Sequence, residues 1–267
     1  MRLALRLVEA GLAVTLLEAD VHDARRRRDL LDRVGAGRIA VAVGDGAGLA
    51  ADLWIGPGAP RAPGALHLRL GAGPLGHGQA VIDVSAPDLG VIEILAGSDP
   101  RAAALARLLG AQPVTLPALL TPRLLARLED AVELLVLDGA APCEVDAAAE
   151  AAGFSPGPCA AQDQRGLARR PRALPLVARM IAEGRLGRAA GVGWYRYPGG
   201  GGRVIDPLIE DMAREEAHFA GHGVRSLDAA EIVSRLRAAL TEAGAGTDPA
   251  ALAQIAAAHG LPIGAPA

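Results

Sequence analysis

The chain has 267 residues and a formal net charge of −3, from 27 basic and 30 acidic side chains. This balance argues against nucleic-acid and membrane-surface binders, which need a basic excess. The length allows one or two domains, and because 51% of the residues are hydrophobic but only 2% aromatic, we expect a core of Leu, Val, Ile and Ala. All the cations are Arg, and the sequence contains neither Lys nor Asn. No role that needs Lys or Asn can therefore be filled.

Cysteine usage and hydropathy indicate a cytoplasmic protein. Cys143 and Cys159 are too few for a disulfide framework and fit a reducing compartment. No apolar run reaches the roughly 18 residues of a membrane span. The N-terminal stretch superficially resembles a signal peptide, but Glu9 and Glu18 interrupt it, and the segment VTLLEAD is typical of a strand rather than a cleavage site.

The first half of the chain mixes helical and strand patterns. The apolar spacing and the turn residues predict helices over 3–10, 23–33 and 100–109, and strands over 14–17, 39–43, 52–55, 66–70, 81–84 and 91–95. Gly and Pro are frequent over 56–80. Strands and helices mixed in this way predict an α/β layer with a mostly parallel sheet.

The pattern becomes helical after Pro117. Helices are expected over a long segment with apolar residues from Leu124 to Leu135, and over 144–152, 174–183 and 207–219. The segment GWYRYPGGGGR, between the last two helices, holds half of the chain's six aromatic residues beside a flexible glycine run. We expect residues 119–200 to pack as one helical unit against these aromatic side chains, which are the largest buriable groups available.

The sequence also contains an internal repeat. ARLEDAV, from Ala126, matches SRLRAAL, from Ser234, and GAAPCEVDAAAEAAGFSPGPCA, from Gly139, resembles GAGTDPAALAQIAAAHGLPIGAPA, from Gly244. The offset of roughly one hundred residues is too long for a solenoid. The repeat therefore predicts a duplicated helical domain whose second copy is cut short at Ala267.

Three glycine clusters, at Gly35, Gly44 and Gly71, are weak candidates for a phosphate-binding turn. That turn needs a strand before it and a helix N-terminus after it. Only GAGPLG at Gly71 is a literal G-x-G-x-x-G, and it leads into another strand. Glu18 is a stronger candidate, because an acid at the end of a Rossmann strand can accept hydrogen bonds from the adenosine ribose. The alternative is an ordinary exposed acid, and Arg25 to Arg28 are expected to be a solvated helix face.

A metal site is conceivable at His218 and His222, whose spacing places two imidazoles on one helix face, with Glu215 one turn earlier. Gly221 and Gly223 indicate that the helix ends there, so an exposed helix end is the favoured interpretation. No Ser, His and Asp set stands out as a nucleophile triad. For the remaining histidines we expect surface or loop positions: His22, His67, His77 and His259.

Several segments together resemble the NAD-dependent 3-hydroxyacyl-CoA dehydrogenase family, especially the dehydrogenase parts of multifunctional fatty-acid β-oxidation enzymes. The most specific are GRLGRAAGVGWYRY and the GFSPGP loop, and LALRLVEAGLAVTLLEAD, SAPDLGVIEILAGSDPRAAALARLLGAQPV and DPLIEDMAREEA add to them. The resemblance covers most of the chain but is weak over 36–80. It implies a truncated Rossmann-like domain over 1–118 that lacks its first strand, a helical domain over 119–203, and a linker helix with a truncated second helical copy over 204–267.

The resemblance also implies a chemistry and its partners. Hydride passes between C3 of a 3-hydroxyacyl-CoA substrate and NAD, while a His takes the hydroxyl proton and a Glu orients that His. Asn and Ser side chains help to bind the substrate. The helical domain closes the acyl-CoA cleft and can form a homodimer.

The site residues depart from this pattern. The family Glu corresponds to Glu93, but the His falls on Asp83 when the segments are anchored at Pro87, or on Val81 when they are anchored at Glu93. His67 lies too far before Glu93, and the family Asn falls on Pro122. Met1 lies about where the family's glycine fingerprint ends.

The primary expectation is therefore a pseudoenzyme, a family member by descent with weak or no activity. The alternatives are a non-catalytic acyl-CoA-binding or assembly module, and a fragment of a longer active enzyme. Of the cofactor contacts only Glu18, and of the catalytic residues only Glu93, remain as candidates.

Overall fold

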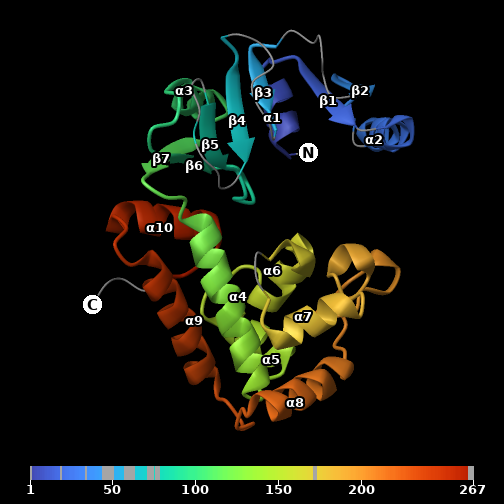
Figure 1. Ribbon diagram of the computed structural model, residues 1–267, viewed down its shortest axis with the longest axis vertical. Coiled ribbons are helices and arrows are strands. Elements are labelled where there is room, and N and C mark those ends of the chain that lie inside the picture. The colour runs from blue at the N-terminus through green and yellow to red at the C-terminus, as the bar shows by residue number, and fades with distance from the viewer. Residues whose placement is uncertain are drawn as a thin grey trace. The chain divides into compact units, whose positions relative to one another are not determined.

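The computed structural model describes residues 2–18, 20–33, 35–43, 51–56, 64–70, 75, 79–170 and 173–263. The chain divides into two compact units, Met1–Leu119 and Leu120–Ala267, which we call the N-terminal unit and the helical unit. In Figure 1 the first is coloured from blue to green and the second from green to red. None of the described helices combines the length and the apolar composition that a membrane span requires.

The N-terminal unit mixes helices and strands, as the sequence predicts. Its elements are α1 (Arg2–Glu9), β1 (Val14–Glu18), α2 (Val21–Arg33), β2 (Ile39–Val43), β3 (Leu53–Ile55), β4 (Leu66–Leu70), β5 (Gln79–Asp83), β6 (Val91–Leu95), α3 (Arg101–Leu108) and β7 (Gln112–Leu116). The predicted elements are present with ends shifted by at most two residues. Strand β7 was not predicted, because Pro113 weakens its pattern. A proline is tolerated there because β7 is an edge strand, paired with β6.

The strands form two sheets. Strands β1 and β2 pair in parallel, with Val14 opposite Ile39. The second sheet has the order β3-β4-β5-β6-β7, and its pairs are parallel except for the antiparallel pair β5–β6. The expectation of an α/β layer with a mostly parallel sheet is therefore confirmed.

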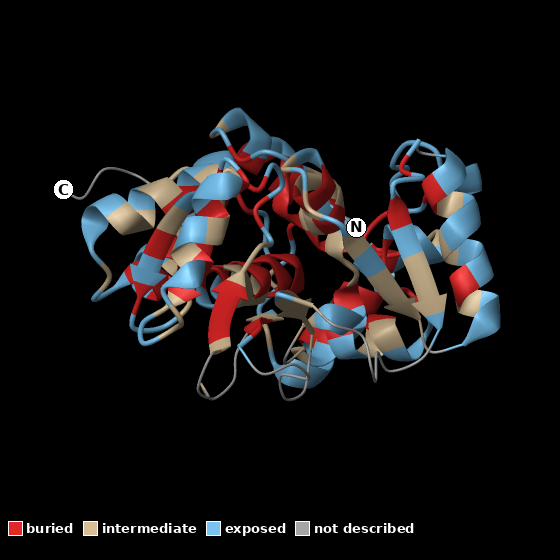
Figure 2. Ribbon diagram, turned by 90° about the horizontal axis from the view of Figure 1, so that it is seen from above, coloured by how far each residue is buried: buried red, intermediate tan, exposed pale blue. Residues whose placement is uncertain are grey.

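Helix α1 packs on both sheets. Its buried residues Ala4, Leu7 and Val8 follow the i, i+3, i+4 spacing of an amphipathic helix. Leu7 belongs to the core of the five-stranded sheet, whereas Ala4 and Val8 pack with residues of α2 and β2. In Figure 2 the peripheral helices accordingly show buried residues, in red, on one face and exposed residues on the other.

The helical unit follows the predicted helical pattern. Its helices are α4 (Thr121–Leu137), α5 (Pro142–Ala151), α6 (Pro158–Arg165), α7 (Pro175–Ala182), α8 (Leu208–Ala220), α9 (Ala229–Gly244) and α10 (Pro249–Ala258). Helix α6 was not predicted. It spans only eight residues and its sequence, PCAAQDQR, has few large apolar residues, although Pro158 at its start favours a helix N-terminus.

The two copies of the sequence repeat lie beside each other within the helical unit. Helix α9, from the second copy, packs against α4 and α5 of the first. Gly260 of the second copy accepts a hydrogen bond from the backbone N–H of Ser155, at 3.1 Å. Gly260 has φ +64°, and a Cβ at this position would clash with the carbonyl oxygen of Ser155. Residues after 203 therefore belong to the same compact unit as the helices before them.

The aromatic segment after α7 is anchored by a buried carboxylate on α6. Asp163 Oδ1 accepts the backbone N–H of Trp194 at 2.9 Å, and Oδ2 accepts the N–H of Tyr195 at 3.0 Å and the hydroxyl of Tyr197 at 2.9 Å. All three aromatic residues are buried. Residues 120–200 lie within one helical unit, as predicted, but the unit continues to residue 267, and Asp163 fixes the aromatic segment beside the glycine run.

Burial makes this carboxylate sensitive to pH. Loss of solvation, which outweighs the three hydrogen bonds, raises the pKa of Asp163 to about 6, from an ordinary value of 3.8. As pH rises, the unfolded chain therefore loses this proton before the folded chain does. The site's contribution to stability is then largest below about pH 4, falls as pH rises toward 6, and stays constant above that value.

An Asp163→Asn comparison tests this dependence. The measured quantity is the free energy of unfolding of the unmodified chain minus that of the variant. We expect this difference to fall by at most about 3 kcal/mol between pH 4 and pH 6. The pKa of Asp163 rises from 3.8 to about 6 on folding, and one pKa unit corresponds to 1.36 kcal/mol. Urea unfolding at a series of pH values measures the difference. Glu210→Gln, at an exposed position on α8, is the control and should show no such fall. A difference that grows with pH over this range would contradict the assignment.

Candidate active site

Two acidic residues face each other across the antiparallel strands β5 and β6. The register places Asp83 directly opposite Glu93 and Ile82 opposite Ile94. Residues directly opposite in an antiparallel pair project from the same face of the sheet. One carboxylate oxygen of Asp83 and one of Glu93 lie within 4.8 Å of each other. Glu93 is buried, with 2% of its surface exposed, and Asp83 is half-buried.

The turn after β5 holds the Asp83 carboxylate. Its Oδ1 accepts the backbone N–H of Ser85 at 2.9 Å and also the Ser85 hydroxyl. The turn is tightened further by Asp88, whose side chain accepts the N–H of Gly90 at 2.8 Å. Asp83 is therefore an oriented hydrogen-bond acceptor at the end of its strand.

The strand register decides between the two positions at which the resemblance places the catalytic His. Asp83 lies opposite Glu93, whereas Val81 lies two residues earlier on β5 and is fully buried. The register therefore places Asp83, and not Val81, across from Glu93. The two residues that face each other at this point of the strands are thus both acids.

No described histidine of the N-terminal unit comes to this position. His67 lies on β4, where it is opposite Trp54 on one side and Gln79 on the other. It is fully buried and its Nε2 lies 2.8 Å from the carbonyl oxygen of Gly56, so the expectation of a surface or loop position was wrong. In the β4 sequence, LHLRL, His67 and Arg69 alternate with Leu, and this alternation predicts an exposed face for both. His77 lies outside the described residues.

Glu18 lies at the carboxyl end of β1, as predicted, but its carboxylate is engaged. Oε1 accepts a hydrogen bond from Arg27 Nε at 2.6 Å, and 17% of the Glu18 side chain is exposed. Arg25, Arg26 and Arg28 are exposed, as the predicted solvated face of α2 requires, and Arg27, whose side chain is 38% exposed, also pairs with Glu18 at the strand end. Ion pairing across the strand–helix connection could not be deduced from the run of four arginines.

The remaining contacts expected for NAD are not found among the described residues. The glycine cluster at Gly44 lies outside them, and so does the cluster at Gly71 apart from Leu75. The cluster at Gly35 is described and follows α2, not a strand. Glu18 is thus the one described candidate for a dinucleotide contact, and its carboxylate is bound to Arg27.

The histidines near the end of α8 have different partners. The helix ends at Ala220, with Gly221 in the left-handed conformation, so His222 lies beyond it, as the glycines predicted. His222 Nδ1 lies 2.9 Å from Asp138 Oδ1, and Arg235 also pairs with Asp138. Burial alone would raise the pKa of Asp138, but its bonds with His222 and Arg235 lower it.

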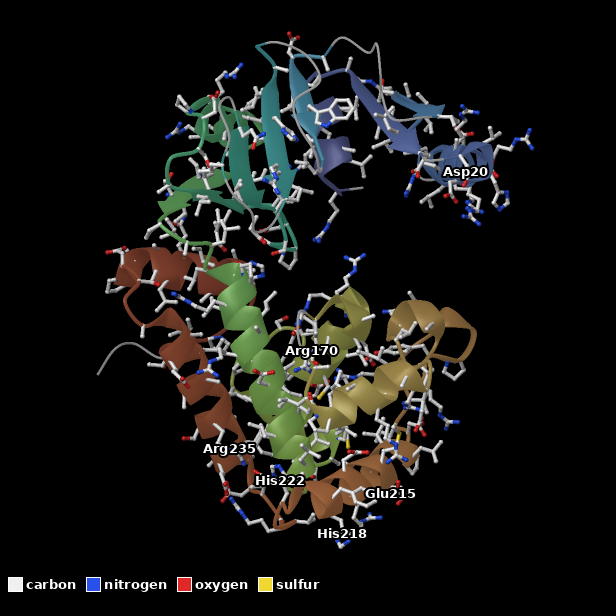
Figure 3. All side chains as sticks on the ribbon, in the orientation of Figure 1. Asp20, Arg170, Glu215, His218, His222 and Arg235 are labelled. Carbon is white, nitrogen blue, oxygen red and sulfur yellow. The ribbon has the colours of Figure 1, made fainter. Side chains whose placement is uncertain are left out.

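His218 and Glu215 lie away from that pair. His218 packs edge-on against Phe219, and Glu215 pairs with Arg179. Within the part of the chain that the structure describes, these two residues and His222 do not form a three-ligand cluster (Figure 3). His222 is thus engaged by Asp138 just beyond the helix end.

Alanine substitutions separate the roles of the two histidines. We expect His222→Ala to lower the free energy of unfolding by roughly 0.5–1.5 kcal/mol, since it removes a hydrogen bond to Asp138. His218→Ala should change it less. Urea unfolding measures both variants, and calorimetric titration with Zn²⁺ should show the same absence of binding in each. Micromolar zinc binding that either substitution abolishes would show that the two imidazoles do converge on a metal.

Comparison with known proteins gives a structural likeness only. The chain matches no protein-family model and no curated protein sequence. The dehydrogenase part of multifunctional enzyme 1 from C. elegans superposes with a TM-score of 0.61 at 15% identity, over 91% of this chain and 70% of that one.

Two bacterial structures superpose over less of the chain. The 3-hydroxybutyryl-CoA dehydrogenase of Escherichia coli K12 gives a TM-score of 0.56 at 20% identity, over 74% of this chain and 57% of that one. The (S)-3-hydroxybutyryl-CoA dehydrogenase of Ralstonia eutropha gives 0.53 at 18% identity, over 73% of this chain and 94% of that one. The chain therefore has the fold of the 3-hydroxyacyl-CoA dehydrogenases, the dehydrogenase part of a multifunctional enzyme among them.

Proposed function

We propose that this chain is a 3-hydroxyacyl-CoA dehydrogenase-like protein whose dehydrogenase activity is at or near background. The observation that carries the proposal is the pairing of Asp83 with Glu93 across β5 and β6. In the reaction that the resemblance implies, a His takes the hydroxyl proton as hydride leaves C3 of the substrate. An acid occupies the counterpart of that His here.

The substitution removes the properties that make an imidazole useful at this step. Histidine changes its charge close to neutral pH and can both take and return a proton. A Glu beside it favours the protonated imidazole, whereas Glu93 beside Asp83 places two acids together, at 4.8 Å or less. A positioned general base contributes on the order of 10²–10⁴ to the rate, so its loss alone accounts for a large fall in turnover.

The ligand class that we propose is an acyl-CoA of the 3-hydroxyacyl or 3-ketoacyl type, as handled in fatty-acid β-oxidation. The fold supports this, since two of the similar structures are 3-hydroxybutyryl-CoA dehydrogenases. A fold by itself does not determine chemistry, however, and the argument about activity depends on the acid pair. No step is assigned to NAD, because Glu18 is engaged by Arg27.

The first test is turnover. We expect reduction of acetoacetyl-CoA with NADH at or near background, because Asp83 replaces the His. A turnover of roughly 1 s⁻¹ or above, typical of working enzymes, would refute the proposal. In that event Asp83→Ala and Glu93→Ala, assayed side by side with Asp29→Ala at an exposed acid of α2 as the control, would show which acid takes part.

A gain-of-function variant provides the second test. Asp83→His alone should leave turnover at background, because Glu18, the one described candidate for a contact with NAD, is paired with Arg27. A rise of tenfold or more in Asp83→His, lost again in the double variant with Glu93→Gln, would show that the base was the single missing element.

The third test concerns ligands. We expect NAD to bind more weakly than about millimolar, since the carboxylate of Glu18 is held by Arg27. Titration calorimetry measures this, and micromolar NAD affinity would contradict it. The same titration with acetoacetyl-CoA distinguishes two hypotheses for a chain without turnover. Tight binding would favour an acyl-CoA-binding module, and weak binding would favour an inactive dehydrogenase.

A further inference from the structure

A narrow ladder of backbone pairs in the helical unit ends at Val204. Isolated antiparallel bridges join Gly187 to Val192, Val192 to Arg196, and Arg196 to Val204. The last bridge has two hydrogen bonds: the N–H of Arg196 donates to the carbonyl oxygen of Val204 at 3.0 Å, and the N–H of Val204 donates to the carbonyl oxygen of Arg196 at 2.9 Å. Both backbone groups of Val204 therefore face the ladder.

The residues on either side of Val204 present an unpaired backbone edge. Alternate residues of an extended segment direct their N–H and C=O groups to opposite sides, so those of Arg203 and Ile205 point away from Arg196. Within the part of the chain that the structure describes, the backbone groups of Arg203 and Ile205 make no hydrogen bond. Ile205 is 55% exposed and Val204 is 43% exposed. Unpaired backbone groups along an open edge are a template for another strand.

Ion pairs hold this edge at both of its ends. Arg203 Nη1 donates to Glu150 Oε1, on α5, at 3.0 Å. Asp206, which follows Ile205, is buried and accepts a hydrogen bond from Arg185 Nη2 at 2.8 Å. The residues between these two ion pairs therefore belong to an ordered segment. A partner that binds here does not have to bear the entropic cost of ordering it.

The exposed apolar side chains of the helical unit are concentrated at this edge. Among the described residues of that unit, the large apolar side chains that are exposed are Leu186, Val204, Ile205, Leu208, Phe219 and Val224. Val204, Ile205 and Leu208 thus supply half of them within one short segment. Single exposed apolar residues are normal on a protein surface, whereas neighbouring ones are typical of an interaction site.

The charge beside the edge indicates the kind of partner. Residues 184–205 contain four arginines and neither Asp nor Glu, in a chain whose net charge is −3. Arg196 lies directly opposite Val204 and so projects from the same face, with 54% of its side chain exposed. Its ion pair with Asp206 is long, at 3.9 Å, and Asp206 is also engaged by Arg185 at 2.8 Å. Arg196 is therefore placed to pair with an acid of a partner.

We propose that the edge formed by residues 203–205 binds an extended polypeptide segment in which acidic and apolar residues alternate. The backbone of the segment pairs with Arg203 and Ile205. Because side chains alternate between the two faces of a strand, its acids meet Arg196 while its apolar residues cover Ile205. In strand addition the main-chain hydrogen bonds supply affinity and the side chains supply selectivity. Edge-to-edge pairing with a second copy of this chain is disfavoured, because Arg196 would then meet its own counterpart.

Two labelled peptides and a matched pair of variants test the proposal. The Glu probe is fluorescein-labelled Gly-Glu-Val-Glu-Ile-Glu-Val-Glu, and the Lys probe has Lys in place of each Glu. By fluorescence anisotropy at low ionic strength, we expect the unmodified chain to bind the Glu probe at least about tenfold more tightly than the Lys probe. Ile205→Pro removes a backbone N–H of the edge and should weaken binding of the Glu probe at least about tenfold. Ile205→Ala keeps that N–H and should weaken it at most about threefold.

A charge reversal gives a second readout that does not depend on the backbone change. Arg196→Glu should invert the preference, so that the Lys probe binds more tightly than the Glu probe. Far-ultraviolet circular dichroism and urea unfolding verify that each variant keeps its fold, and if Ile205→Pro does not, the charge reversal decides.

Three results would overturn the proposal. They are no binding of the Glu probe by the unmodified chain at about millimolar concentration, equal binding by folded Ile205→Pro and Ile205→Ala, and an unchanged preference in Arg196→Glu. A dimer of this chain, seen by sedimentation, that the Glu probe does not dissociate would likewise contradict it.

Discussion

The antiparallel register of β5 and β6 is the constraint on which the candidate active site depends. It places Asp83 opposite Glu93, and a shift by one residue would turn one of these side chains to the other face of the sheet. The short turn after β5 keeps this register, because Asp83 and Asp88 each accept backbone N–H groups within it. The register thereby brings two acids together on one face of the sheet.

Buried acids organise the helical unit in a comparable way. Asp163 anchors the aromatic segment, and Asp146 on α5 accepts the N–H of Cys159 at 2.7 Å and the hydroxyl of Tyr195 at 2.8 Å. Burial raises the pKa of Asp146, and the hydrogen bonds oppose that rise. The GRLGRAAGVGWYRY segment is therefore a packing element: Gly193 lies so close to the Asp163 carboxylate that any Cβ there would clash with it.

The fold and the site lead to separate conclusions. Structures at 15–20% identity share the arrangement of the chain, which shows that the apolar pattern needed for the fold tolerates extensive replacement. The reacting groups tolerate much less, because proton transfer needs a particular group at a particular place. In this chain the fold accompanies Asp83 opposite Glu93 and Arg27 paired with Glu18.

The sequence by itself determined the elements whose pattern is local. Periodicity located α4 and most of the strands, the repeat anticipated α9 and α10, and the position of Glu18 at a strand end followed from the glycine and the apolar run before it. Only the tertiary structure decided which of Val81 and Asp83 faces Glu93, that Arg27 binds Glu18, that His67 is buried, and that Asp163 holds Trp194. These features depend on strand register and on contacts between residues distant in sequence. Neither leaves a periodic signal in the chain.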